Sequence, residues 1–261
     1  FLEIQNFKRL RHSRIDFGLE KTVFVGANNS GKTTAMDACI KFLGRDRKLC
    51  FNDFTASYRT SIDDIGKEWV TSDHSELIDI STLEPYLPTF DVWIDVEDSE
   101  LQYVFHIIPT LDWKGGTLGV RYLYEPKNIN DLFKDFRQLY TNARKTENGK
   151  SSLKLWPISL SDYLEKRVES QFEIKAYILD PTLINDTEVQ KTPFEMATFE
   201  ANPLDKLMFV RVIEAQRNFS DVGDSDQRER SGGLLSSQLR DHYKNHLNPD
   251  TEPSQDDIKI I

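Results

Sequence analysis

The sequence predicts an α/β fold with an antiparallel β-meander and a helical insertion. In residues 1–25 and 90–126, apolar and polar residues alternate over short stretches, as they do in strands with one solvent-exposed face. Residues 35–43 and 129–171 carry apolar residues at helical spacing. Strand-forming and helix-forming segments therefore follow each other along the chain, which is typical of domains that mix the two.

The composition indicates a folded protein whose surface as a whole does not attract nucleic acid. The 261 residues are 38% hydrophobic, which is enough for a sizeable core, and the formal net charge is −10. No apolar run reaches the roughly 18 residues of a membrane span, and the charged residues 1–10 do not resemble a signal peptide. We therefore expect a cytoplasmic protein with no membrane partner.

Residues 1–25 are predicted to form three strands that pair in sequence order. The stretches are residues 1–7, 13–17 and 21–25, and the connections between them are short. The basic residues of this region cluster within one predicted hairpin and are Lys8, Arg9, Arg11, Arg14 and Lys21. Such a cluster either contacts an anionic partner or is the solvated edge of a hairpin, and both interpretations stay open.

The middle of the chain is predicted to contain the meander and two helices. The meander is expected within residues 90–126, with its middle strand at residues 101–110. Amphipathic helices are expected at residues 129–143 and from near Ser159 to residue 171, where the spacing of Ser159 and Asp162 indicates a capping box. A strand is expected at residues 172–180.

Less regular patterns surround these elements. Residues 45–85 are polar and irregular and are expected to form a surface insertion, and residues 181–206 are interpreted as a long connection. Residues 206–217 have the apolar pattern of a buried strand. Residues 218–233 are polar and are expected to be mobile, whereas residues 234–247 are expected to form a Leu-rich helix.

Residues 25–34, VGANNSGKTT, contain the pattern of a phosphate-binding loop (P-loop). Its glycines let successive N–H groups point at a phosphate, and the helix that follows adds the positive end of its dipole. Lys32 is expected to reach the β- and γ-phosphates, and the Thr33 hydroxyl is expected to ligate Mg²⁺. The sequence therefore predicts ATP and Mg²⁺ as cofactors, bound by consecutive residues of the motif. These are Gly26, Ala27, Asn28, Asn29, Ser30, Gly31, Lys32, Thr33 and Thr34.

Residues 2–44 resemble the N-terminal lobe of the SMC and recombination-repair ATPases, and most closely that of the overcoming-lysogenization-defect (OLD) family. The resemblance is carried by the strand LEIQNFK and by the loop GANNSGKT, which match the strand and loop patterns of that family. It continues more weakly within residues 206–247, through VRVIEAQRNFSD and SGGLLSSQL. The resemblance implies a P-loop NTPase fold of the kind found in ABC-type ATPase heads.

The same resemblance implies roles for residues outside the loop. Lys8 and Arg9, in the turn after the first strand, are expected to approach the nucleotide phosphates, and Asn28 is expected to line the loop. Gln216 is expected near Mg²⁺ or the attacking water, where it would act in catalysis together with Lys32. The alternative for Gln216, a polar residue at the end of a strand, stays open.

One element that an ABC-type site needs is not evident. Its catalytic strand, the Walker B strand, ends in Asp-Glu, where Asp holds Mg²⁺ and Glu polarises the attacking water. Asp95 lies in a strand whose alternation marks a half-solvated surface, and Asp180 is followed by Pro181 where a Glu is expected. The stretch RSGGLL, residues 230–235, lacks flanking residues of the ABC signature, and a helix start capped by Ser231 is its alternative interpretation.

The resemblance further implies that residues 1–261 are the N-terminal part of one ATPase domain. They would comprise a P-loop lobe at 1–50, the meander at about 90–125, a helical insert at about 130–170 and, at about 172–261, a strand, a mobile loop and a helix returning to the lobe. The rest of the ATPase domain and a TOPRIM nuclease domain would lie outside this chain. We therefore expect this chain alone to bind ATP weakly and to hydrolyse it poorly.

The leading hypothesis is the ATP-binding head of an OLD-family nuclease that acts on DNA, in phage defence or DNA processing. The family implies a homodimer or higher oligomer through the ATPase region, DNA as a partner of the full-length protein, and an accessory protein. Two alternatives stay open. One is a self-contained P-loop NTPase or kinase with Asp180 in the metal-binding role, and the other is a dimerisation or partner-docking module built on the meander and residues 130–170.

Overall fold

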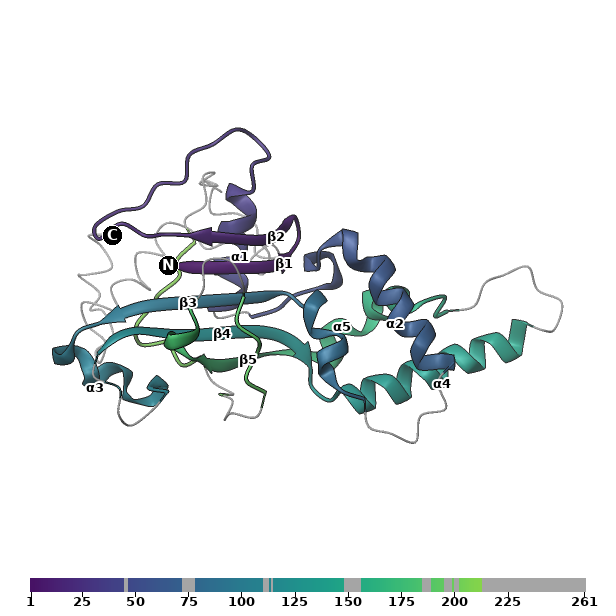
Figure 1. Ribbon diagram of the computed structural model, residues 1–261. Coiled ribbons are helices and arrows are strands. Elements are labelled where there is room, and N and C mark those ends of the chain that lie inside the picture. The colour runs from purple at the N-terminus through teal and green to yellow at the C-terminus, as the bar shows by residue number, and fades with distance from the viewer. Residues whose placement is uncertain are drawn as a thin grey trace, which may run out of the picture. The chain divides into compact units, whose positions relative to one another are not determined.

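A five-stranded antiparallel sheet organises the part of the chain that the structure describes, with the strand order β2-β1-β3-β4-β5 (Figure 1). The strands are β1 (Leu2–Phe7), β2 (Leu10–Ile15), β3 (Thr89–Val96), β4 (Gly116–Pro126) and β5 (Phe172–Leu179). The computed structural model describes residues 1–44, 47–71, 78–109, 113, 115–147, 156–184, 189–194, 199 and 202–212. Residues 1–210 form one compact unit, and the description below concerns that unit.

The register of the sheet places β1 between two partners. Leu2 pairs with Ile15 of β2 and with Val92 of β3, so both sides of β1 are hydrogen-bonded. The connection between β1 and β2 consists of Lys8 and Arg9 only. This tight turn lies at the end of the sheet where β4 ends and β5 begins, because the pairing continues in register across all five strands.

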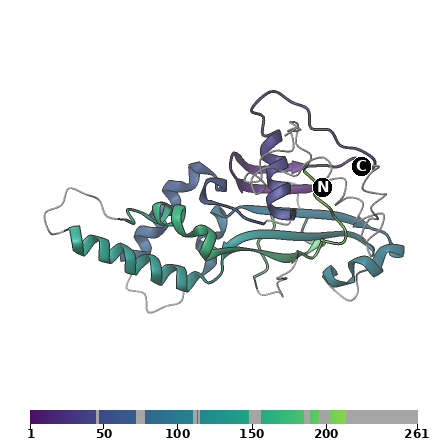
Figure 2. The ribbon, with the colours of Figure 1, turned by 180° about the vertical axis from the view of Figure 1, so that it is seen from behind.

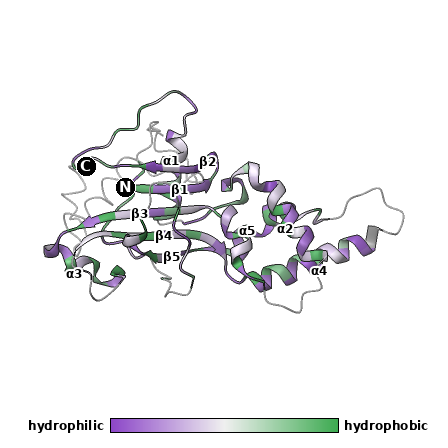
Figure 3. Cartoon of the chain, in the orientation of Figure 1, coloured by the Kyte–Doolittle hydropathy of each residue, from purple (hydrophilic) through white to green (hydrophobic). Residues whose placement is uncertain are grey.

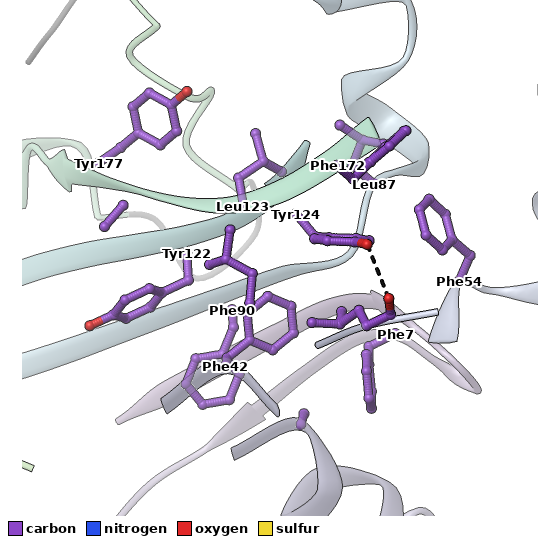
Figure 4. Packing of buried hydrophobic residues seen from close by; sticks show 14 of the residues in the cluster. Phe7, Phe42, Phe54, Leu87, Phe90, Tyr122, Leu123, Tyr124, Phe172 and Tyr177 are labelled. Atoms are coloured by element: carbon purple, nitrogen blue, oxygen red, sulfur yellow. Dashed lines mark hydrogen bonds between the residues drawn. The ribbon is translucent and has the colours of Figure 1, made fainter. Parts of the chain in front are cut away.

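Helix α1 (Lys32–Leu43) packs against β1 and covers the face of the sheet that Figure 2 turns toward the viewer. Its buried residues include Ala35, Ala38 and Phe42, whereas Met36 is exposed. Phe42 stacks on Phe90 of β3 with ring centroids 5.4 Å apart, a contact at the centre of the core in Figure 4. Aromatic pairs of this kind add about 0.5–1.5 kcal/mol to the effect of area burial, so α1 is firmly attached to the sheet.

Three further helices, α2 (Arg59–Thr71), α4 (Ile129–Glu147) and α5 (Leu160–Gln171), pack on one another at one end of the sheet (Figure 1). Trp69 of α2 contacts Phe133 and Phe136 of α4, and Phe136 also contacts Tyr163 of α5. Along α4 hydrophobic and hydrophilic residues alternate with the helical turn (Figure 3), as expected for a helix with one buried face. None of the helices among the described residues has the length and apolar composition needed to cross a membrane.

Several elements predicted from the sequence are present. The predicted strands 1–7 and 172–180 correspond to β1 and β5, and β1 pairs with β2 as expected. The predicted strand 13–17 overlaps β2 at residues 13–15 only, because β2 begins at Leu10 and ends at Ile15. The predicted helices 129–143 and 159–171 correspond to α4 and α5. In β1, β5 and α5 the local pattern of apolar residues matches the face that is buried, whereas β2 has no fully buried residue.

The predicted strand at residues 21–25 is wrong. These residues have no regular secondary structure, and the exposed fractions of Val23 and Val25 are 64% and 88%. A strand is stable where a neighbouring strand takes up its hydrogen bonds, and no strand of the described residues does so here. The apolar composition of the segment was therefore not sufficient to form the strand.

The predicted three-stranded meander is a two-stranded hairpin. Its expected middle strand, residues 101–110, contains the short helix α3 (Leu101–Val104) and a 3₁₀ turn, so β3 and β4 pair directly with each other. Val104 and Ile107 are buried while Phe105 is 72% exposed, and the three-residue spacing of the buried pair is that of a helical turn.

Two other predictions from the sequence also need correction. Residues 45–85 are not a polar, irregular surface insertion, because they contain helix α2. Ile62 and Trp69 of this helix are buried, so one of its faces belongs to the core. Of the predicted strand at 206–217, residues 206–212 have no strand structure, and Phe209 is 70% exposed. Residues 213–217, with the predicted mobile stretch and C-terminal helix, lie outside the described residues.

The face of the sheet opposite α1 contains a buried ion pair. The Arg121 guanidinium donates to both carboxylate oxygens of Asp91, at 2.8 and 2.6 Å, and both side chains are almost completely buried. Arg121 also donates to the Gln190 carbonyl and to the Thr192 hydroxyl. The segment 189–194 is thereby attached to this face, and the guanidinium donates four hydrogen bonds in all.

We predict that Asp91→Ala lowers the free energy of unfolding by about 3–5 kcal/mol, because Arg121 then remains buried without its counter-charge. Urea unfolding followed by circular dichroism measures the change. The matched control is Asp95→Ala, on the same strand but exposed to solvent, for which we expect a loss below about 0.5 kcal/mol. Equal losses in the two variants would show that the buried ion pair contributes no more to the free energy of unfolding than an exposed carboxylate does.

Candidate nucleotide-binding site

The Gly-rich loop leads directly into α1, which begins at Lys32. Asn29 and Gly31 have φ angles of +70° and +95°, and the Gly31 carbonyl accepts the first helical hydrogen bond, from the Ala35 N–H at 2.9 Å. The left-handed backbone at Gly31 is a conformation that side chains with a Cβ rarely adopt. The second glycine of the motif is therefore required by the backbone of the turn into the helix.

The loop folds around the side chain of Lys32. Its ammonium donates to the carbonyl oxygens of Gly26 and Ala27, both at 2.6 Å, and to the Ser30 hydroxyl at 3.3 Å. A Cβ at position 26 would lie 3.0 Å from the Ser30 hydroxyl oxygen, so the first glycine allows this close approach. The loop residues 26–30 are exposed, and these contacts are accessible to solvent.

The β1–β2 turn lies against the loop. The Arg9 guanidinium donates to the side-chain oxygen of Asn29. A Cβ built at Gly31 would be 3.1 Å from the Leu10 side chain, which shows how closely the start of β2 approaches the loop. The structure therefore brings Arg9, predicted to be a phosphate contact, into direct contact with a loop residue.

Lys8 has two carboxylate partners. Its ammonium contacts Asp37 of α1 and lies 3.5 Å from a carboxylate oxygen of Asp53. Burial by itself would lower the pKa of Lys8, but the hydrogen bond and charge of Asp37, and then those of Asp53, raise that pKa above its usual value. Lys8 thus remains charged and lies beside α1, and it makes no hydrogen bond to the loop itself.

The other predicted site residues are placed as follows. Ala27, Asn28 and Thr33 are exposed, and Thr34 is partly buried in the first turn of α1. Gln216 lies outside the described residues, so the structure does not place it. Sequence reasoning had found the loop and the two basic residues of the turn.

Asp180, the candidate metal ligand of the alternative NTPase hypothesis, is far from the loop. It follows β5, at the edge of the sheet opposite β2. Leu179 pairs with Gly119, and Gly119 pairs with Trp93, whose N–H donates to the residue that precedes β1. Asp180 is therefore at the end of the sheet where β1 begins, whereas the turn against the loop follows the other end of β1. Its carboxylate caps a 3₁₀ turn by accepting from the Thr182 N–H at 2.8 Å.

Three residues beside the site were not identified from the sequence. Asp37 and Lys41 lie one turn apart on α1, and Asp53 lies in the 3₁₀ turn η1 (Phe51–Asp53). Asp37 and Lys41 are four residues apart, a spacing that predicts a charged face on the helix and could have identified them from the sequence. For Asp53 the local sequence carries no such signal, because its partners are 12 and 45 residues away.

A Gly-rich loop that folds around a lysine ammonium at the start of a helix is the arrangement of proteins that bind nucleoside triphosphates. The family model of an AAA ATPase domain matches residues 1–261, and the chain belongs to this family. No curated protein and no solved structure matches the chain. Membership of the family implies ATP as the nucleotide and, typically, Mg²⁺ as its metal ion.

We predict that Gly31→Ala lowers the free energy of unfolding by about 1–2 kcal/mol, because an L-residue is strained at this φ. Gly31→Asn is the matched control, since it adds the same Cβ beside Leu10 but tolerates the left-handed region better. We therefore expect a smaller loss for Asn than for Ala in urea unfolding. Identical losses would mean that contact with Leu10, and not the backbone angle, determines the requirement for glycine.

Proposed function

We propose that residues 26–34 bind the phosphates of Mg·ATP and that the domain hydrolyses ATP. The observation that carries the proposal is the Lys32 ammonium, held by the carbonyl oxygens of an exposed Gly-rich loop at the start of α1. In this proposal the loop N–H groups and Lys32 hold the phosphates, and the Thr33 hydroxyl holds Mg²⁺. The bound nucleotide supplies the phosphoanhydride bond that is cleaved.

The charges around the loop favour an anion. The first turn of α1 contains no acidic residue, so no side chain competes there with a phosphate for the helix N-terminus. Arg9 adds a positive charge through its contact with Asn29. The hydrogen bonds of the Lys32 ammonium are solvent-accessible, so a phosphate could replace the carbonyl oxygens at little cost.

We further propose that this ATPase domain is an ABC-type head of the OLD class, in a cytoplasmic protein that acts on DNA. The proposal is supported by the resemblance of residues 2–44 to that class and by the family match. It includes Gln216 as a residue near the attacking water, a homodimer through the ATPase region, and a nuclease activity of the full-length protein with an accessory partner. The alternative with Asp180 as metal ligand is disfavoured by the position of that residue at the opposite end and edge of the sheet.

A second candidate function is partner docking by the helical group of α2, α4 and α5. The observation that favours it is the aromatic core that these helices form among themselves, which includes Trp69, Phe136 and Tyr163. A group with its own core can present a rigid surface to a partner. This function is compatible with ATP binding, because no residue of the loop takes part in the aromatic contacts of the helical group, although both lie at the same end of the sheet (Figure 1).

We predict that Lys32→Ala abolishes measurable ATP binding, because the phosphates lose their principal point charge. Isothermal titration calorimetry with ATP and Mg²⁺ measures the affinity of both forms. The free energy of unfolding is expected to change by less than about 0.5 kcal/mol, since the ammonium makes only solvent-accessible contacts.

The control for Lys32→Ala is Lys67→Ala, which removes an exposed lysine of α2 that pairs with Asp64. We expect this variant to bind ATP like the unmodified protein. If Lys32→Ala also bound ATP with unchanged affinity, the loop would not be the nucleotide site.

A further inference from the structure

Asp53 is a buried carboxylate with two lysine partners. Its side chain is 1% exposed, and one of its oxygens accepts from the Lys41 ammonium at 2.6 Å and from the Cys50 N–H at 2.9 Å. The other oxygen lies 3.5 Å from the Lys8 ammonium. A carboxylate at this depth is stable only when it is paired, so Asp53, Lys8 and Lys41 form one electrostatic unit.

The backbone around Lys8 is held in an unusual conformation. Asn6 and Lys8 have φ angles of +55° and +52°, a region that residues other than glycine occupy at a cost of about 1–3 kcal/mol. The Lys8 N–H donates to the Asp53 carbonyl at 2.7 Å, and the Thr55 N–H donates to the Asn6 carbonyl at 3.2 Å. Both the backbone and the side chain of Asp53 therefore hold the β1–β2 turn.

The Asn6 side chain attaches the same turn to a third segment. It donates to the carbonyl oxygens of Pro85 and Leu87, both at 3.0 Å. With β1 paired on both sides, the turn has little freedom to relax. Strained residues that are held this firmly are concentrated at functional sites.

The turn held by Asp53 places one cation against the nucleotide loop and a second against α1. Arg9 contacts Asn29 of the loop, and Lys8 contacts Asp37 of α1. Asp37 follows Thr33 by four residues, so it lies about 6 Å further along the helix axis. Lys8 therefore contacts α1 about one helical turn after Thr33, the residue proposed to hold Mg²⁺.

We infer that Asp53 is a positioning residue for nucleotide binding, which acts by holding Lys8 and the turn that carries Arg9. The inference rests on the proposed function of the loop. Without the carboxylate, Lys8 and Lys41 lose their shared counter-charge and Lys8 is held by Asp37 alone. The Lys8 ammonium is then less firmly positioned beside α1, whereas the backbone hydrogen bond from Lys8 to Asp53 remains.

The test is a double-mutant cycle on the full chain, with ATP and Mg²⁺ as the probe in isothermal titration calorimetry. Asp53→Asn keeps the shape of the side chain and removes its charge, and Lys8→Met removes the cation it positions. We expect each variant to weaken binding by about tenfold, the effect of one charged contact, and the double variant to be no weaker than either one. Asp53→Glu is expected to restore part of the affinity.

The control is a second Asp–Lys pair, Asp64 and Lys67, which is exposed on α2 with an N–O distance of 2.6 Å. Asp64→Asn is expected to leave ATP affinity unchanged. Thermal unfolding of every variant is recorded, because Asp53→Asn is also expected to lower stability. The affinities are compared at a temperature at which every variant is folded, so that a loss of stability is not mistaken for a loss of binding.

Three outcomes would overturn the inference. One is unchanged affinity in folded Asp53→Asn, the second is unchanged affinity in Lys8→Met, and the third is a double variant whose loss is the product of the single losses. Lys8→Met changes a partly exposed side chain and remains informative if Asp53→Asn does not fold.

If Lys32→Ala abolishes binding while Asp53→Asn binds normally, only this inference fails. If Lys32→Ala binds normally, the proposed function fails as well.

Discussion

The position of β1 between β2 and β3 is the constraint on which the candidate site depends. Because β1 is paired on both sides, its last residues and the two-residue turn to β2 have one available path. That path places Arg9 against Asn29 of the loop and Lys8 between Asp37 and Asp53. Helix α1 is attached to the same sheet through Phe42, so the helix start and the turn are held on one support.

The two faces of the sheet are covered by different means. On the side of α1, aromatic and aliphatic side chains pack together, and the Tyr124 hydroxyl is satisfied by the Leu49 carbonyl at 3.0 Å (Figure 4). On the other side, the Asp91–Arg121 pair attaches the segment 189–194 to the strands. Both faces of β3 are therefore buried over most of its length, although its sequence alternates like that of a strand with one solvated face. Asp91 follows that alternation, but it is buried because Arg121 provides its counter-charge.

The elements that sequence reasoning predicted correctly are those whose signal is local. Helices α4 and α5 have apolar residues at helical spacing over three or more turns, and the loop motif defines its own turn into α1. The predictions for residues 21–25 and 101–110 were wrong because each relied on an apolar stretch of strand-like composition. Whether such a stretch becomes a strand depends on the availability of a partner, and β3 and β4 pair with each other instead. Helix α2 was missed although Ile62 and Trp69 lie at helical spacing, because the polar residues around them dominated the pattern.

The sequence by itself determined the nucleotide loop, since the positions of Gly26, Gly31 and Lys32 follow from short-range geometry. It also indicated that basic residues of the first turn lie near that loop, through the resemblance of residues 2–44 to a known ATPase class. Only the tertiary structure decided how Lys8 is held, because Asp53 is 45 residues away in the chain and reaches it through the packing of η1 against the end of β1. The tertiary structure also decided the role of Asp180. Its place at the end of an apolar run suggested a metal ligand, but the order and register of the strands put it at the other end of the sheet from the loop. Contacts of this kind depend on long-range pairing, which short-range patterns do not encode.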